Sequence, residues 1–319
     1  MLGKPGAAMR AALALSTPKV LEMSAASTET HAIKADAACL WPAGAILGEG
    51  PVWHRGEGKL YWTDIKGSRL LAYRPENDAR EEWRLPCRIG SIGVPAPDWT
   101  PPQELAGTPL LACGDAGLMW LGLRGPDVAT IPIADPEAHL PENRFNDGKI
   151  GPDGRYWAGT MHDPETDATG NLYAFTPDGE TALLDTGYRV TNGPAFSPDG
   201  RTVYHNDSAL QTIYAFDLNP DGTLRNKRVF HQFGPEEGYP DGMTTDRAGN
   251  LWVAMWDGAR VEKISPQGVR LGHVTVPTPH VTSCAFQGDD ETVLYVTSAK
   301  IGLDAPDSFA GALFRIRLG

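Results

Sequence analysis

The chain has 319 residues, of which 41% are hydrophobic and 21% are charged, and its formal net charge is −12. This composition supplies enough apolar side chains for a packed core and excludes an intrinsically disordered chain. It also argues against nucleic acid as a partner, because phosphate backbones attract dense positive charge and the densest basic cluster is the short stretch 225–228.

The N-terminal segment has a basic part followed by an apolar part. Lys4 and Arg10 precede a short apolar stretch at 11–15, which imitates a secretion signal but is too short and has no clean cleavage site. We therefore predict a poorly ordered leader, or a misassigned start, over residues 1–35 and one folded domain over residues 36–319.

Neither the cysteines nor the apolar runs indicate an oxidising or membrane environment. The four cysteines are scattered, without a Cys-x-x-Cys pair or the Cys/His spacing of a zinc site: Cys39, Cys87, Cys113 and Cys284. No apolar run approaches the ~20 residues that a membrane-spanning helix needs. The sequence thus predicts a cytoplasmic protein with reduced thiols and no membrane contact.

Short segments of similar sequence recur along the chain. Gly-Pro-Val-Trp-His at 50–54 leads to Leu-Tyr-Trp-Thr-Asp at 60–64, and Gly-Pro-Ala-Phe-Ser at 193–197 leads likewise to Val-Tyr-His at 203–205. Three further copies begin near residues 147, 242 and 284, and a degenerate sixth joins 89–95 to 110–113. The last three steps between copies are 46, 49 and 42 residues, and the first step, of 97, holds two units. A period of roughly 40 to 50 residues predicts a β-propeller, here with six blades.

Each unit has the pattern of antiparallel strands, with polar and apolar residues alternating in short runs rich in Trp, Tyr, Val and Leu. Pro-Asp-Gly, whose Asp-Gly step permits the positive-φ turns of hairpins, occurs at 152–154, 177–179, 198–200, 220–222 and 240–242. We predict an all-β fold, a six-bladed β-propeller with four-stranded antiparallel blades around a central channel, closed by pairing 37–41 with 312–316. Trp62, Trp157 and Trp252 are expected in the core between blades.

The repeat also predicts a site, because equivalent residues of successive blades are related by rotation about the channel. Four oxygen-bearing side chains precede or begin repeat copies: Glu49, Asn146, Asn192 and Asp241. Carboxylates that face one another in a confined space repel and resist desolvation, and a cation relieves both penalties. The alternative is that each residue only caps a turn. Four of them at matching positions favour a metal site.

The ligand types indicate which cation to expect. Carboxylate and amide oxygens are hard ligands that suit Ca²⁺, Mg²⁺ or Mn²⁺, whereas Zn²⁺ or Fe²⁺ require the protein to impose the geometry. Three protein ligands would leave positions open for water and substrate, as a catalytic metal site requires. We therefore expect one divalent cation, with Ca²⁺ first among these ions.

Five ordered segments are similar to the signatures of a known family. They are Leu-Gly-Glu-Gly-Pro-Val-Trp at 47–53, Arg-Phe-Asn-Asp-Gly-Lys at 144–149, Gly-Thr-Met-His at 159–162, Thr-Asn-Gly-Pro at 191–194 and Tyr-Pro-Asp-Gly-Met at 239–243. From about residue 45 to the C-terminus the chain resembles the senescence-marker-protein/gluconolactonase family, also called regucalcin-like. Segments 204–208 and 214–218 are most similar to bacterial xylono- or arabinolactonases.

The resemblance implies a role for individual residues. By it, Glu49, Asn192 and Asp241 are the metal ligands, and Arg144 and Asn146 contact the sugar hydroxyls and the lactone. It implies a hydrolase that opens a sugar lactone, such as a pentonolactone or gluconolactone, to the aldonic acid. The expected partner is that small molecule, and the expected assembly is a monomer or a weak homo-oligomer.

One segment departs from the family pattern. Some members carry a further substrate-contacting Glu shortly after Gly-Thr-Met, where this chain has Pro164 flanked by Asp163 and Glu165. The departure leaves the sugar specificity undetermined. His162 is predicted to line the pocket and contact the substrate, and an exposed loop position is the alternative.

Hydrolysis of a lactone requires a polarised carbonyl, an activated water and a stabilised oxyanion, and a metal can supply the first and third. We predict that Asp241 is catalytic, taking the proton from the attacking water and returning it to the leaving ring oxygen. Arg144 and Asn146 would orient the substrate. Asp207 is predicted either to support the site from behind or to be a turn residue at a strand end.

Two other functions stay open. One is a propeller esterase or phosphotriesterase, because metal propellers share architecture and Lewis-acid chemistry. The other is a non-catalytic calcium-binding propeller. No motif supports another catalytic scheme. The sequence lacks the serine-hydrolase motif Gly-x-Ser-x-Gly, the zinc-protease motif His-Glu-x-x-His and the phosphate-binding motif Gly-x-x-x-x-Gly-Lys.

Overall fold

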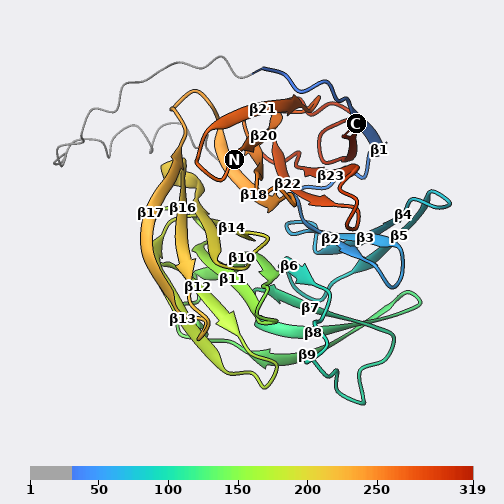
Figure 1. Cartoon of the computed structure of the whole chain (residues 1–319). Helices are drawn as coiled ribbons and strands as arrows, with labels where there is room; N and C mark the ends of the chain where they lie inside the picture. Colours follow the sequence, from blue (N-terminus) through green and yellow to red (C-terminus); the bar gives the residue numbers. More distant parts are fainter. Residues whose placement is uncertain (1–30, 319) are drawn as a thin grey trace.

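Six antiparallel sheets of four strands each surround a central axis in the computed structural model, which describes residues 31–318 (Figure 1). The six-bladed propeller and its four-stranded blades are thereby confirmed. The first strands of neighbouring blades contact one another all the way around, so six strands line the axis: β2, β6, β10, β14, β18 and β22.

The blades follow one another in chain order. Blade 1 contains β2 (Gly48–His54), β3 (Lys59–Asp64), β4 (Arg69–Arg74) and β5 (Ala79–Arg84). Blade 2 contains β6 (Ile89–Gly93), β7 (Thr108–Gly114), β8 (Gly117–Arg124) and β9 (Asp127–Ala134). Blade 3 contains β10 (Asn143–Ile150), β11 (Tyr156–His162), β12 (Gly170–Phe175) and β13 (Thr181–Tyr188).

The second half of the ring has the same plan. Blade 4 contains β14 (Thr191–Phe196), β15 (Thr202–Asp207), the short 3₁₀ helix η1 (Ser208–Leu210), β16 (Thr212–Leu218) and β17 (Leu224–Gln232). Blade 5 contains β18 (Tyr239–Thr245), β19 (Leu251–Trp256), β20 (Arg260–Ile264) and β21 (Arg270–Thr275). Blade 6 contains β22 (Val281–Phe286), β23 (Val293–Ser298), β24 (Leu313–Arg317) and, on its outer edge, β1 (Ala37–Trp41).

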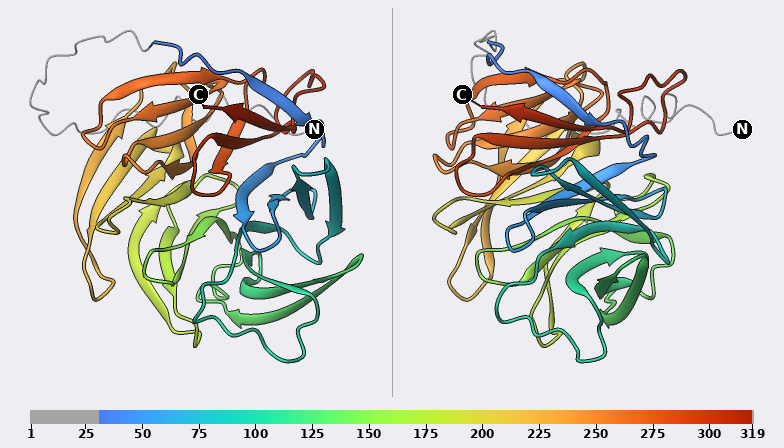
Figure 2. Two further views of the ribbon diagram at one scale, coloured as in Figure 1. Left: turned by 45° about the vertical axis from the view of Figure 1, so that its right-hand side comes forward. Right: turned by 90° about the vertical axis from the view of Figure 1, so that its right-hand side faces the viewer.

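The ring closes where the two ends of the chain pair in blade 6. β1 runs antiparallel to β24, with Ala37 opposite Ile316 and Cys39 opposite Phe314. Figure 2 shows the blue strand β1 beside the dark red strands of this blade. The predicted closing pair is confirmed, and because the outermost strand comes from the far end of the chain, the ring cannot open without breaking this ladder.

Aromatic side chains fill the spaces between blades. Trp157 packs edge-on against Phe196 of the next blade, with ring centroids 5.4 Å apart, and Trp252 packs in the same way against Phe286 at 6.1 Å. Trp62 meets Trp41 of blade 6 at 5.0 Å. All three predicted tryptophans are at most 2% exposed, so the expected inter-blade core is confirmed.

One of the predicted turns is wrong. Four of the Pro-Asp-Gly segments end in a glycine with positive φ at a turn: Gly154, Gly179, Gly200 and Gly222. The fifth, at 240–242, lies inside β18 instead. A Cβ on Gly242 would overlap Ser283 of blade 6. The innermost strands of blades 5 and 6 therefore approach each other so closely that only glycine fits, and this contact, not a turn, explains the glycine.

The leader predicted for residues 1–35 lies mostly outside the described residues. Within residues 31–35, the Ile33 amide donates to the His273 carbonyl oxygen at 2.8 Å, and Ile33 and Ala35 pack against the core between blades 5 and 6. No helix in residues 31–318 is long and apolar enough to cross a membrane. The four cysteines are free thiols, as predicted.

A buried histidine between blades 3 and 4 predicts a pH dependence of stability. His205 is fully buried against the Tyr188 ring, and neither ring nitrogen has a hydrogen-bond partner. Burial lowers its pKa to about 3. Because the unfolded chain takes up this proton near the ordinary value of about 6.5, stability is lost as the pH falls below that value.

The prediction is tested with His205→Phe, which cannot titrate. Between about pH 7 and pH 5.5, we expect the free energy of unfolding of the wild type to fall by about 1 kcal/mol more than that of the variant. Urea denaturation at the two pH values measures this difference. Parallel decreases in both proteins would show that His205 is protonated in the folded state.

Candidate active site

The four oxygen-bearing side chains predicted from the repeat lie in the first half of four innermost strands. Glu49 lies on β2, Asn146 on β10, Asn192 on β14 and Asp241 on β18. Each is nearly buried, with 4% to 7% of its surface exposed. Four of the six blades therefore bring one such group to the same end of the channel.

The backbone is irregular at each of these positions. The β2–β3 register shifts between Glu49 and Val52, and the β18–β19 register shifts between Pro240 and Met243. The first strands of blades 3 and 4 have shifts at the corresponding point. A bulge adds a residue and turns side chains out of the regular alternation of a strand. The repeated bulge therefore turns polar side chains of these four blades toward the channel.

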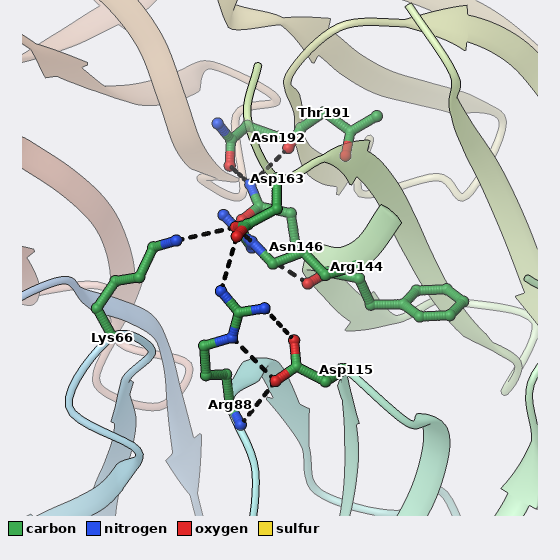
Figure 3. Close-up of polar contacts among 9 residues, drawn as sticks. Lys66, Arg88, Asp115, Arg144, Asn146, Asp163, Thr191 and Asn192 are labelled. Atoms are coloured by element: carbon green, nitrogen blue, oxygen red, sulfur yellow. Dashed lines mark hydrogen bonds and ion pairs between the residues drawn. The ribbon is translucent and has the colours of Figure 1, made fainter. Parts of the chain in front are cut away.

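A chain of hydrogen bonds joins the predicted site residues, and each residue donates to the next one in the chain (Figure 3). Arg144 Nη1 donates to Asn146 Oδ1 at 2.6 Å, and Asn146 Nδ2 donates to Asn192 Oδ1 at 3.0 Å. Asn146 Nδ2 also donates to the Thr191 carbonyl oxygen at 2.8 Å. Asn192 Nδ2 donates in turn to Ser208 Oγ at 2.9 Å. Both amides thus have a single consistent orientation, because a guanidinium can only donate.

Glu49 and Asp241 are neighbouring buried carboxyl groups. Burial, followed by the charge of Asp147, raises the pKa of Glu49 to about 8. Burial, followed by the charges of Glu49 and Asp147, raises the pKa of Asp241 well above its usual range. Asp241 Oδ1 is buried without a hydrogen-bond partner. Such a cluster is unfavourable unless protons or a cation neutralise it.

The donor set at this end of the channel fits a hard divalent cation. Two carboxylates and the amide of Asn192 supply oxygen atoms only, which is the ligand type that Ca²⁺, Mg²⁺ and Mn²⁺ prefer. Within residues 31–318, no group of three or more His, Cys, Asp or Glu side chains is arranged to hold a metal. The predicted set therefore depends on the amide oxygen of Asn192.

Asp147 and Lys149, which the repeat pattern did not predict, also lie in the channel. The Asp147 carboxylate accepts hydrogen bonds from the amides of Gly148 at 2.8 Å and Gly193 at 2.9 Å, and so holds the backbone next to Asn192. Burial raises its pKa to about 6, and the charge of Lys149 opposes this shift. Regular alternation places Asn146 and Asp147 on opposite faces of a strand, so only the bulge brings both into the channel.

Beyond these residues the channel holds a small cavity. Its volume is about 160 Å³, and it is lined by the residues that follow the bulges on four innermost strands: 50–52, 92–94, 147–150 and 283–284. Small-molecule pockets usually measure roughly 300 to 1,000 Å³. The volume of this cavity lies below that range, so the cavity by itself does not identify the substrate pocket.

Three cationic side chains from different blades meet at Asp163 (Figure 3). The carboxylate accepts hydrogen bonds from Lys66 Nζ at 2.9 Å, Arg88 Nη1 at 2.9 Å and Arg144 Nε at 2.6 Å. These partners hold the pKa of Asp163 well below its usual range, against the effect of burial. Asp115 binds Arg88 from the other side, with Arg88 Nε donating at 2.9 Å. The guanidinium of Arg144 is thus fixed by Asp163 on one side and by Asn146 on the other.

The loop after β11 clarifies the departure from the family pattern. Asp163 is fully engaged with its three cations, whereas Glu165 is exposed on its loop near Arg144 and Lys66. Desolvation raises the pKa of Glu165, and the charges of these two cations oppose the rise. His162 Nδ1 accepts a hydrogen bond from the Asp167 amide at 3.2 Å, so the ring anchors its own loop. A substrate contact by His162 stays a prediction.

Asp207, for which the sequence left two roles open, binds the backbone that leads into the strand of Asn192. Its carboxylate oxygens accept hydrogen bonds from the amides of Arg189 at 3.0 Å and Val190 at 3.2 Å. Asp64, at the end of β3 in blade 1, likewise binds the amide of Leu47 at 3.0 Å. The strand-end aspartate therefore fastens the connection that enters its blade, and the repeat explains why it recurs.

Comparisons with known proteins agree with this architecture. Residues 47–300 match the SMP-30/Gluconolactonase/LRE-like region. Regucalcin of Oryctolagus cuniculus is 33% identical over 87% of this chain and 93% of its own length, and pentonolactonase XacC of Haloferax volcanii is 36% identical over 85% and 90%. The crystal structure of a calcium-binding protein, regucalcin, from Agrobacterium tumefaciens has a TM-score of 0.80 and 26% identity, covering 88% of this chain and 93% of that one. The chain therefore belongs to the SMP-30/gluconolactonase family, as its sequence resemblance predicted.

Proposed function

We propose that the protein is a metal-dependent lactonase that opens an aldonolactone, a pentonolactone or gluconolactone, to the aldonic acid. The observation that carries the proposal is the buried Asp241 carboxylate, which has an unpartnered oxygen and lies beside Glu49 at the end of the channel where the innermost strands begin. The pentonolactonase of Haloferax volcanii is among the relatives that match over most of their length. Cytoplasmic location and a monomeric or weakly associated state stay predictions.

Glu49, Asn192 and Asp241 would hold the cation, with Ca²⁺ as the first candidate. When bound, a divalent cation supplies Lewis acidity at the lactone carbonyl. Arg144 and Asn146 orient the sugar, because their side chains are already fixed by Asp163 and by Asn192. Preorganised donors of this kind require no rearrangement when the substrate arrives.

Asp241 is the base in the proposed reaction. Its carboxylate takes a proton from the attacking water as the new carbon–oxygen bond forms at the lactone carbonyl. The bond from that carbon to the ring oxygen then breaks, and Asp241 returns the proton to the ring oxygen. Water is consumed, and the product is the open-chain hydroxy acid.

The proposal is tested by pH-stat assays of xylono-, arabino- and gluconolactone before and after chelation. We expect turnover to fall at least about a hundredfold on metal removal and to return with one of Ca²⁺, Mg²⁺, Mn²⁺, Zn²⁺ or Fe²⁺. Full activity in the chelated protein would refute metal dependence. Faster hydrolysis of paraoxon than of any lactone would favour the phosphotriesterase alternative, and tight Ca²⁺ binding without turnover would favour the non-catalytic one.

A further inference from the structure

Ser208 accepts the hydrogen bond from the side-chain amide of Asn192, the last one in the chain that begins at Arg144. It is the first residue of η1, directly after β15, and it is 8% exposed. Its hydroxyl lies between two blades, because it contacts the side chain of Asn192 in blade 4 and the carbonyl oxygen of Pro240 in blade 5. Pro240 directly precedes Asp241. Ser208 thus touches both chain segments that carry predicted ligands in these blades.

The single hydroxyl proton of Ser208 decides how Asn192 is oriented. Ser208 Oγ lies 2.6 Å from the Pro240 carbonyl oxygen and 3.3 Å from Asn206 Oδ1, and because both of these oxygens can only accept, the proton points toward them, chiefly to the nearer Pro240 oxygen. The lone pairs of Oγ are then left to accept from Asn192 Nδ2 at 2.9 Å. With its nitrogen held by Ser208, Asn192 must present Oδ1 on the opposite side, where Asn146 Nδ2 donates to it. A flipped amide would place two N–H groups against each other.

A second side chain of the same strand supports this arrangement. Asn206 is fully buried, lies opposite Asn192 in the β14–β15 ladder, and donates from Nδ2 to the Asp241 carbonyl oxygen at 2.9 Å. The backbone on both sides of the Pro240–Asp241 peptide bond is therefore held from β15 and η1. These contacts lie across the boundary between blades 4 and 5.

We propose that Ser208 is a positioning residue for the cation site: it fixes the amide of Asn192 with Oδ1 facing the channel and holds the segment that carries Asp241. The inference rests on the proposed function, in which Asn192 and Asp241 are metal ligands. Groups that orient ligands in this way typically contribute about 10- to 100-fold to metal affinity. Ser208 itself does not contact the metal or the reacting atoms.

The test is calorimetric titration of CaCl₂ into metal-free wild type, Ser208→Ala, Ser208→Thr and Ser265→Ala. Ser265 is the matched control, because it is also 8% exposed and its hydroxyl also binds backbone, but in the turn after β20, far along blade 5 from the site. We expect Ser208→Ala to bind Ca²⁺ about 10- to 100-fold more weakly, and Ser208→Thr, which keeps the hydroxyl, to bind more tightly than the alanine variant. Ser265→Ala should bind as the wild type does.

Activity measured against Ca²⁺ concentration gives a second readout. The concentration that half-activates Ser208→Ala should rise by the same factor as the dissociation constant, and saturating Ca²⁺ should restore most of its turnover. Equal Ca²⁺ affinity in wild type and Ser208→Ala would overturn the inference. If the alanine variant does not fold, Ser208→Cys replaces it in the comparison with the wild type, because a thiol has a similar volume to the hydroxyl but forms only weak hydrogen bonds. A wild type that binds no divalent cation would instead refute the metal site itself, and with it the proposed function.

Discussion

Replacing Asp241 with alanine is expected to abolish lactone hydrolysis. The substitution removes one of the three predicted metal ligands and the proposed base together, and a general base alone contributes about 10²- to 10⁴-fold. We expect kcat to fall at least about a thousandfold, measured by pH-stat with the lactone that the wild type hydrolyses fastest and with excess divalent cation. The variant should remain folded, because the substitution removes a buried carboxyl group whose ionised form is disfavoured by burial and by the charges of Glu49 and Asp147.

Asp246→Ala is the control for this experiment. Asp246 directly follows β18, whose start carries Asp241, and it is 8% exposed against 6% for Asp241. Its carboxylate accepts from the Asn250 amide at 2.8 Å and from Trp252 Nε1 at 3.1 Å, so its loss should lower stability and leave kcat unchanged. Lactonase activity of the Asp241→Ala protein equal to that of the wild type would remove Asp241 from the mechanism.

The two predicted functions of Asp241 are separated by Asp241→Asn. Asparagine keeps an oxygen ligand but cannot take a proton at neutral pH. We expect this variant to retain more Ca²⁺ affinity than the alanine variant, while its turnover is reduced to a similar extent. Substantial turnover in the asparagine variant would show that Asp241 acts as a ligand only.

Glu49→Gln is expected to stabilise the metal-free protein and to weaken metal binding. Burial and the charge of Asp147 raise the pKa of Glu49 to about 8, so the folded protein disfavours the ionised form. The wild type therefore loses stability as the pH rises from about 4.3, the ordinary pKa of glutamate, through the folded value. Glutamine carries no charge, and at about pH 8.5 it should increase the free energy of unfolding by about 1 kcal/mol or more.

The opposite sign of the two effects makes the prediction specific. Guanidinium denaturation in chelator measures the stability gain, and calorimetry measures the Ca²⁺ affinity, which should fall about 10- to 100-fold because glutamine keeps an oxygen ligand but loses the negative charge. Glu262→Gln is the matched control, because Glu262 is fully buried but is paired with Arg260 at 2.5 Å and with Arg270. That variant should be destabilised, since it removes the buried charge that the partly buried guanidinium groups of Arg260 and Arg270 pair with. Destabilisation of the metal-free protein by Glu49→Gln would show that Glu49 does not experience the predicted repulsion.

Much of the site was predictable because the fold is periodic. In a propeller, residues at the same point of successive repeats lie around one axis, so Glu49, Asn146, Asn192 and Asp241 could be placed together by counting. The same logic predicted the closing pair of β1 and β24 and the burial of the repeated tryptophans. It failed for 240–242, where an Asp-Gly step that usually makes a turn lies within a strand.

Other parts of the site depend on contacts between residues from different repeats. Asp163 is tied to Lys66 and Arg88, which are 97 and 75 residues away along the chain, and no sequence pattern links them. Asp147 was missed because a bulge, which the alternation of a strand does not predict, turns it into the channel. Ser208 was missed because its partners lie on two blades.

The sequence by itself determined the number of blades, the manner of ring closure, the family and the oxygen-bearing positions around the axis. The reason is that each repeat of apolar residues and turns folds into one blade, and successive blades are related by the same rotation about the axis. Only the tertiary structure decided which way each polar group points and what neutralises it. Those choices depend on bulges, on hydrogen bonds between blades and on the exclusion of water from the channel, and each of them combines residues that are distant in the chain.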